Sequence, residues 1–130
     1  MSQLISSLGS FRFFLNTEIV FGDGSFDSLN ARVSPLGSRP LIVTGRHSAR
    51  AVGILDRALE QLPNARVFDA IDENPDTAIC EQGAAVCNEN DCDVIVAIGG
   101  GSPIDAAKAI ALLARNGAPC AQYFGAEQYA

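Results

Sequence analysis

The chain has 130 residues, of which 48% are hydrophobic and 18% charged, with a formal net charge of −6 and a pI of about 4.5. This composition is typical of one folded domain and excludes a disordered chain. The acidic charge argues against nucleic acid or an anionic membrane as a partner. Because the amino terminus is unlike a signal peptide and no run of about 18 apolar residues occurs, we expect a cytoplasmic protein.

The amino-terminal part is expected to hold a β-hairpin and a short helix. Aromatic and β-branched side chains over 11–15 and 18–21 predict two strands, joined by a turn at Asn16-Thr17. A helix is expected over 25–33. Gly22 and Gly24 resemble the start of a dinucleotide-binding fingerprint, but its last glycine is missing, so we interpret them as a turn that ends the hairpin.

Strands and helices then alternate along the chain. We expect strands over 40–44, 66–69 and 94–98, the last of them an apolar run of the kind that is buried on both faces of a parallel sheet. The expected helices cover 48–62, 77–89 and 103–115. The first has an apolar stripe of Ser48, Val52, Leu55, Leu59 and Leu62. The last is expected to end in a left-handed cap at Asn116-Gly117. This order predicts an α/β fold with a Rossmann-like, mainly parallel sheet flanked by helices, preceded by the N-terminal β-hairpin.

The most informative segment is DVIVAIGGGSPIDAAK, residues 93–108. Gly99, Gly100 and Gly101 have no Cβ atoms, so phosphates can approach their backbone N–H groups. A tight turn required only for packing is the alternative interpretation. Three consecutive glycines exceed what packing requires, and we therefore predict a phosphate-binding turn.

The residues after the glycines predict the start of a helix. We expect Ser102 to be its N-cap, Pro103 its first residue and Asp105 its third. The unpaired N–H groups and the positive end of the helix dipole would then point to the space beside the glycine turn.

The string GGGSPIDAAKAIA at 99–111 closely resembles the signature of iron-containing alcohol dehydrogenases, whose relatives include glycerol dehydrogenases and, more distantly, dehydroquinate synthases. FFLNTEIVFGDG at 13–24, LIVTG at 41–45 and Asn74-Pro75 stand in the family's order. The resemblance implies that residues 1–130 are the dinucleotide-binding domain, and that the helical, metal-binding domain of the family is absent from this chain. We expect 118–130 to begin the connection to it.

A strand end at Gly45 bears on the choice between NADP and NAD. Nucleotide-binding sheets often present a carboxylate to the ribose there, and the resemblance implies Asp at this position in members that prefer NAD. Gly45 leaves space for a 2′-phosphate, and Arg46 would supply the countercharge. We therefore predict NADP, while a solvated surface role for Arg46 stays open.

Further cofactor contacts are implied by the resemblance. Asn74 matches a family asparagine beside the cofactor, although the acidic stretch 69–76 by itself predicts a turn and a helix cap. Asp105 and Lys108 also match the family string. Their spacing equally favours an intrahelical ion pair, so contact with the cofactor and structural support both stay open.

No catalytic or metal-ligating residue is expected in this chain. His47 is the only histidine, too few for an iron or zinc centre of the family's kind, and we expect it at the surface or the cofactor rim. The cysteines show no C-x-x-C spacing and are expected to be free thiols.

The resemblance implies a function for the intact protein. A divalent metal, iron or zinc, would polarise a small alcohol or carbonyl substrate, and hydride would pass between substrate and NADP or NAD. We expect the 130 residues alone to bind nucleotide weakly and to catalyse nothing. A stand-alone nucleotide-binding module and a lyase fragment of the dehydroquinate synthase kind are alternatives, and assembly into a homo-oligomer stays open.

Overall fold

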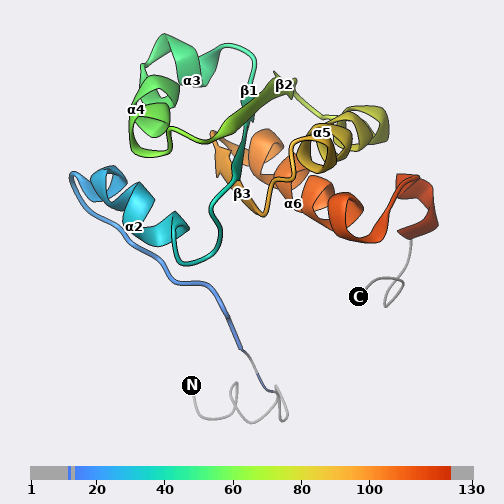
Figure 1. Ribbon diagram of the computed structural model, residues 1–130, viewed down its shortest axis with the longest axis horizontal. Coiled ribbons are helices and arrows are strands. Elements are labelled where there is room, and N and C mark those ends of the chain that lie inside the picture. The colour runs from blue at the N-terminus through green and yellow to red at the C-terminus, as the bar shows by residue number, and fades with distance from the viewer. Residues whose placement is uncertain (1–11, 13, 124–130) are drawn as a thin grey trace, which may run out of the picture.

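The computed structural model describes residue 12 and residues 14–123. They form a parallel sheet with the strand order β2-β1-β3, in which β1 is Pro40–Gly45, β2 is Arg66–Ile71 and β3 is Val94–Ile98. One face is covered by α2 (Leu29–Val33), α3 (Ser48–Ala51) and α4 (Ile54–Gln61), and the other by α5 (Thr77–Glu89) and α6 (Gly101–Asn116) (Figure 1). Short 3-10 helices, η1 (Ser25–Ser28) and η2 (Cys120–Tyr123), flank these elements. The predicted α/β class is confirmed.

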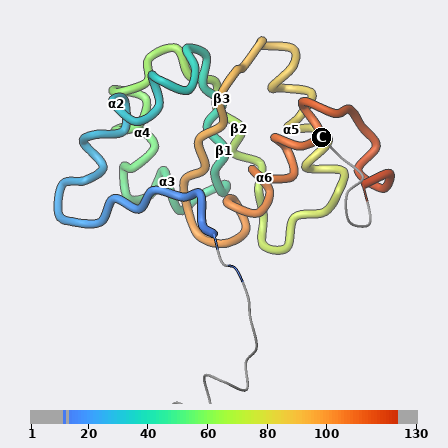
Figure 2. Tube along the Cα trace, turned by 90° about the horizontal axis from the view of Figure 1, so that it is seen from below, coloured from blue at the N-terminus to red at the C-terminus, as the bar shows by residue number. Residues whose placement is uncertain are grey.

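The central strand β1 organises the core. Its apolar side chains are fully buried and alternate between the two faces: Leu41 and Val43 pack with α5 and α6, whereas Ile42 packs with α4. Figure 2 shows the two groups of helices on opposite sides of the strands. Each such side chain stabilises the fold by about 1.5–3 kcal/mol relative to an exposed one.

The strand that we expected to be buried on both faces is half-buried instead. All residues of β3 have intermediate exposure. Within the described residues β3 pairs only with β1, so it lies at the edge of the sheet, and it is β1 that is covered on every side.

The expected amino-terminal hairpin is not observed. Residues 14–21 form no strand, and Ile19 and Phe21 are 77% and 98% exposed. Residues 11 and 13 of its first strand lie outside the described residues. An isolated hairpin is marginally stable, and residues 14–21 belong to neither of the two described hydrophobic clusters that would hold one in place. Gly22 and Gly24 do form a turn, which leads into η1 and α2 in place of the single expected helix.

The single helix expected over 48–62 is broken into α3 and α4. Gly53 between them has φ 73°, a left-handed conformation that glycine adopts without steric cost. Because of this break, Val52 points away from the predicted apolar stripe and is 73% exposed, while Leu55 and Leu62 stay buried. The helix predicted over 77–89 is confirmed. Gly117 ends α6 with φ 91° and ψ 157°, so the expected left-handed cap is not observed.

Asp93 fastens the loop before β1 to the loop before β3. Its carboxylate accepts hydrogen bonds from the backbone N–H groups of Arg39 (2.7 Å) and Ser38 (3.1 Å). These bonds stabilise the charged form and lower the pKa of Asp93. A Cβ on Gly37 would collide with the same carboxylate, so the loop packs closely against it.

We expect Asp93→Asn to lower the free energy of unfolding at neutral pH, because a neutral amide is a weaker acceptor for these N–H groups. The folded-state pKa of Asp93 lies below its ordinary value of 3.8, so this stabilisation is present above that value and is lost as the pH falls through the folded-state pKa. Urea unfolding of both proteins should show midpoints that differ at neutral pH and converge in acid. A difference that persisted in acid would contradict the charge-based explanation.

Candidate functional site

The carboxyl ends of the three parallel strands meet at one end of the sheet. A hollow of about 350 Å³ opens there, which we call the glycine-turn pocket. It is lined by three segments, one following each strand: 45–48, 71–73 and 100–103. Ligands of open α/β sheets bind at this place, outside the carboxyl ends of the strands.

Glycine is present at the three positions of the turn for different physical reasons. Gly99 has φ 138°, and a Cβ on it would lie 2.9 Å from Cγ of Pro103, so the backbone and its packing require glycine. A Cβ on Gly100 or Gly101 would meet nothing within 4 Å. Packing therefore explains Gly99 only. The other two leave bare backbone facing open space, which is the geometry a phosphate needs.

Helix α6 begins earlier than expected. Gly100 is its N-cap, with an extended backbone, and Gly101 is its first residue, so Ser102 is not the cap and Pro103 is not the first helical residue. No side-chain hydrogen bond caps this helix start within the described chain. The extended backbone of Gly100 already has the conformation of an N-cap residue. No capping side chain therefore covers the first N–H groups of α6, where the helix dipole also attracts an anion.

Thr44 connects the turn to the centre of the sheet. Its fully buried side chain donates a hydrogen bond from Oγ1 to the carbonyl oxygen of Ile98, at 2.9 Å. Ile98 directly precedes Gly99, and Gly45 directly follows Thr44. The bond therefore holds the glycine turn beside the end of β1.

Gly45 and Arg46 both line the glycine-turn pocket, as the NADP prediction requires. A Cβ on Gly45 would lie 3.6 Å from the nearest atoms, an ordinary contact, so the fold tolerates a side chain there and glycine is not required for packing. Arg46 Nε lies 2.7 Å from Oδ1 of Asp72. Arg46 is thus a half-exposed charge at the pocket that pairs with Asp72.

Asn74 lies in a second hollow of about 440 Å³, which we call the Asn74 pocket. Ser102 and Asp105 from α6 line it too, and Ser102 also lines the glycine-turn pocket. The chain around Asn74 forms a turn and a cap, as predicted: Asn74 has φ 52°, and Asp76 accepts a hydrogen bond from the N–H of Ile79 at 2.9 Å.

Lys108 is not among the residues that line either pocket. Its Nζ lies 3.8 Å from Oδ1 of Asp105, and both side chains are more than 70% exposed, at 75% and 78%. The structure therefore shows the expected intrahelical pair, and it brings only Asp105 of the two to a pocket.

Sequence reasoning missed four residues of the glycine-turn pocket as binding candidates: Ser48, Ile71, Asp72 and Glu73. The signal was available for the last two, because they directly follow β2 and the carboxyl ends of parallel strands share one edge. His47, expected at the surface or the rim, is exposed and lines this pocket.

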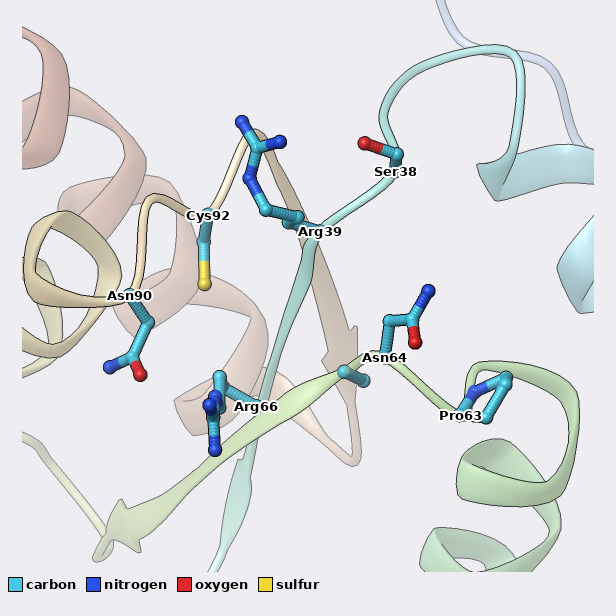
Figure 3. A pocket seen from close by; sticks show the side chains of 8 residues that line it. Ser38, Arg39, Pro63, Asn64, Arg66, Asn90 and Cys92 are labelled. Carbon is cyan, nitrogen blue, oxygen red and sulfur yellow. The ribbon is translucent and has the colours of Figure 1, made fainter.

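A separate pocket of about 520 Å³ lies at the opposite end of the sheet, where the strands begin (Figure 3). Its lining includes Arg39, Arg66, Asn90 and Cys92. It shares no residue with the glycine turn, so its size does not make it the site of the dinucleotide motif.

The described part of the chain holds neither a metal-ligand cluster nor a helix that could span a membrane. Residues 14–123 contain no group of three or more His, Cys, Asp or Glu side chains placed to hold a metal ion. The four cysteines are free thiols as expected, and desolvation raises the pKa of Cys80, Cys87 and Cys92. Among the described helices none is both long and apolar enough to pass through a membrane.

Comparison with known proteins identifies the family. The sequence model of the iron-containing alcohol dehydrogenase family matches residues 16–130 of this chain. The chain belongs to this family. It is 37% identical over 106 residues to NADH-dependent butanol dehydrogenase A of Clostridium acetobutylicum, covering 78% of this chain and 27% of that enzyme. It is 32% identical to 1,3-propanediol dehydrogenase of Klebsiella pneumoniae, covering 82% of this chain and 29% of that enzyme.

Solved structures agree with this assignment. An iron-containing alcohol dehydrogenase of Thermotoga maritima superimposes with a TM-score of 0.85 at 28% identity, over 93% of this chain and 35% of the other. The family resemblance inferred from the glycine string is confirmed. The chain spans only about a quarter to a third of the length of these relatives, at 27%, 29% and 35%.

Gly101→Ala tests whether the open backbone serves a ligand. Its methyl group meets no protein atom, so we expect the free energy of unfolding to stay unchanged or to rise by up to about 1 kcal/mol from helix propensity. We expect the affinity for NADPH to fall at least about 10-fold, because the methyl group occupies the space of the phosphates. Titration calorimetry and urea unfolding measure both.

Gly99→Ala is the matched control. It forces a side chain into φ 138° against Pro103 and should lower stability by about 1–3 kcal/mol. If Gly101→Ala bound NADPH as tightly as the parent protein, the diphosphate would have to lie elsewhere.

Proposed function

We propose that this chain is the cofactor-binding part of an NAD(P)-dependent alcohol dehydrogenase, which transfers hydride between a nicotinamide dinucleotide and a small alcohol or carbonyl compound. The observation that carries the proposal is the bare backbone of Gly100 and Gly101 at the uncapped start of α6, facing a pocket lined by all three strand ends. The family membership and the dehydrogenase names of the relatives support it.

The glycine-turn pocket and the neighbouring Asn74 pocket would bind different parts of the cofactor. The N–H groups at Gly100, Gly101 and Ser102 would receive the diphosphate. The adenosine ribose would lie beside Gly45, and the amide of Asn74 would donate to ribose or phosphate. When bound, the cofactor supplies the hydride acceptor or donor, and the residues of this chain hold and orient it.

We further propose a preference for NADP over NAD. Gly45 provides no carboxylate to accept hydrogen bonds from the ribose hydroxyls or to repel a 2′-phosphate, and Arg46 lines the same pocket. Four relatives are named as NADH-dependent or probable NADH-dependent butanol dehydrogenases, and this is a property of those enzymes. The feature of this chain on which the proposal rests is the absence of a side chain at Gly45, at the end of β1.

A metal centre does not fit the residues of this chain that the structure describes. The family name implies iron, yet the described residues offer no ligand cluster and the sequence has a single histidine. We therefore assign no catalytic step to this chain. Substrate activation would be carried out by residues of a longer protein, in keeping with the limited share of the relatives' length that the chain covers.

Titration of the chain with NADPH and NADH at a fixed salt concentration tests the proposal. We expect both to bind, NADPH more tightly, because only NADPH carries a 2′-phosphate that Arg46 could bind. We expect no oxidation of alcohols or reduction of aldehydes by these 130 residues.

Three results would contradict parts of this proposal. Failure of both dinucleotides to bind would exclude the cofactor site. Tighter binding of NADH would overturn the NADP preference alone, and turnover by the 130 residues would show that catalysis does not need further residues.

A further inference from the structure

Two ion pairs link β2 and the residue that directly follows it to the segment after β1. Arg46 pairs with Asp72 at 2.7 Å, and Arg50 of α3 pairs with Asp69 at 2.6 Å. The pairs are chemically alike and all four side chains are partly exposed, between 41% and 64%. They differ in place: only Arg46 and Asp72 line the glycine-turn pocket.

The pairing decides how much positive charge Arg46 offers to a ligand. Its guanidinium is the group in the pocket suited to a phosphate dianion, but Nε is engaged by the carboxylate of Asp72. Glu73 beside it adds a second negative charge to the lining. A 2′-phosphate therefore competes with Asp72 for Arg46, either by exchange at Nε or through the other guanidinium N–H groups, and it also approaches a negatively charged wall.

The exchange is physically accessible. Exposed ion pairs are weak because solvent screens the charges and the long side chains lose conformational freedom. Asp72 is 64% exposed and follows the end of β2, so its carboxylate can turn into water when a ligand takes its place. Arg46 is half exposed and remains reachable.

We propose that Asp72 is a specificity-determining residue, which limits the preference for 2′-phosphorylated dinucleotides by holding Arg46 in an ion pair. The inference rests on the proposed cofactor site. Asp72 acts through Arg46 and by repulsion of the phosphate, and NADH, which has a hydroxyl group at this position, is largely insensitive to both effects.

Asp72→Asn in the full chain tests this role. We expect the affinity for NADPH to rise about 3- to 10-fold and the affinity for NADH to change less than about 2-fold, as removal of one nearby negative charge in solvent predicts. The gain should shrink as salt is added, because screening weakens exposed charges. Titration calorimetry at low and at high salt measures both affinities, and 2′,5′-ADP and 5′-AMP provide a pair of shorter probes that differ only in the 2′-phosphate.

Asp69→Asn is the matched control. It removes the same charge from a residue of β2 close to Asp72 and breaks the Arg50 pair, yet it lies outside the glycine-turn pocket, so we expect less than about a 2-fold change for either dinucleotide. In Arg46→Gln, addition of Asp72→Asn should give a smaller gain for NADPH than it gives in the parent, because part of the effect passes through Arg46.

The outcomes separate this inference from the function on which it rests. If the parent binds both dinucleotides but Asp72→Asn gives no gain for NADPH, or if Asp69→Asn gives an equal gain, the role of Asp72 is wrong and the cofactor site stands. If the parent and both variants bind neither dinucleotide, the cofactor site and the role of Asp72 fail together.

Discussion

The burial of β1 between two strands and two layers of helices is the constraint on which the rest of the structure depends. Its residues Leu41 to Thr44 are completely inaccessible to solvent, and each face packs against a different group of helices. A parallel strand in this position forces the chain to cross over the sheet before each new strand, so all three strands end on the same side. The glycine-turn pocket follows from this arrangement, because the segments that leave the three strands all begin at the same edge of the sheet.

The glycine turn shows how one short segment satisfies packing and binding with different residues. Gly99 is required by its positive φ and by the ring of Pro103 packed against it, whereas no packing contact requires glycine at Gly100 or Gly101. The hydrogen bond from Thr44 to the carbonyl oxygen of Ile98 holds the glycine turn beside the end of β1. A buried hydrogen bond thus positions the exposed backbone of Gly100 and Gly101.

The sequence predicted the elements whose signals are local. The pattern of apolar residues predicted all three strands and the helix over 77–89, the acidic stretch 69–76 predicted a turn and a helix cap, and the glycines marked the turn. Errors arose where a distant contact decides the outcome. Whether β3 or β1 lies at the centre depends on strand order, which the periodicity of a single strand does not contain. The hairpin pattern at 14–21 lacked a packing surface, and the break at Gly53 depends on a backbone conformation that a spacing of apolar residues does not reveal.

The pocket was predicted in part for the same reason. Gly45, Arg46 and the glycine turn carry a motif signal. The place of Asp72 directly after β2 indicates only the edge of the sheet where it lies, and its pairing with Arg46 is seen only in the folded sheet. This matters for a protein of net charge −6 that must hold an anion. The backbone at the start of α6 offers attraction that no carboxylate neutralises, because N–H groups and a helix dipole form no ion pair. A guanidinium in an acidic environment is different, because it is already paired with a carboxylate before the ligand binds. Its contribution to the binding free energy is the attraction to the phosphate less the attraction to the carboxylate that the phosphate replaces. The diphosphate site is therefore set by the fold, while the ribose end of the pocket is set by competition between charges.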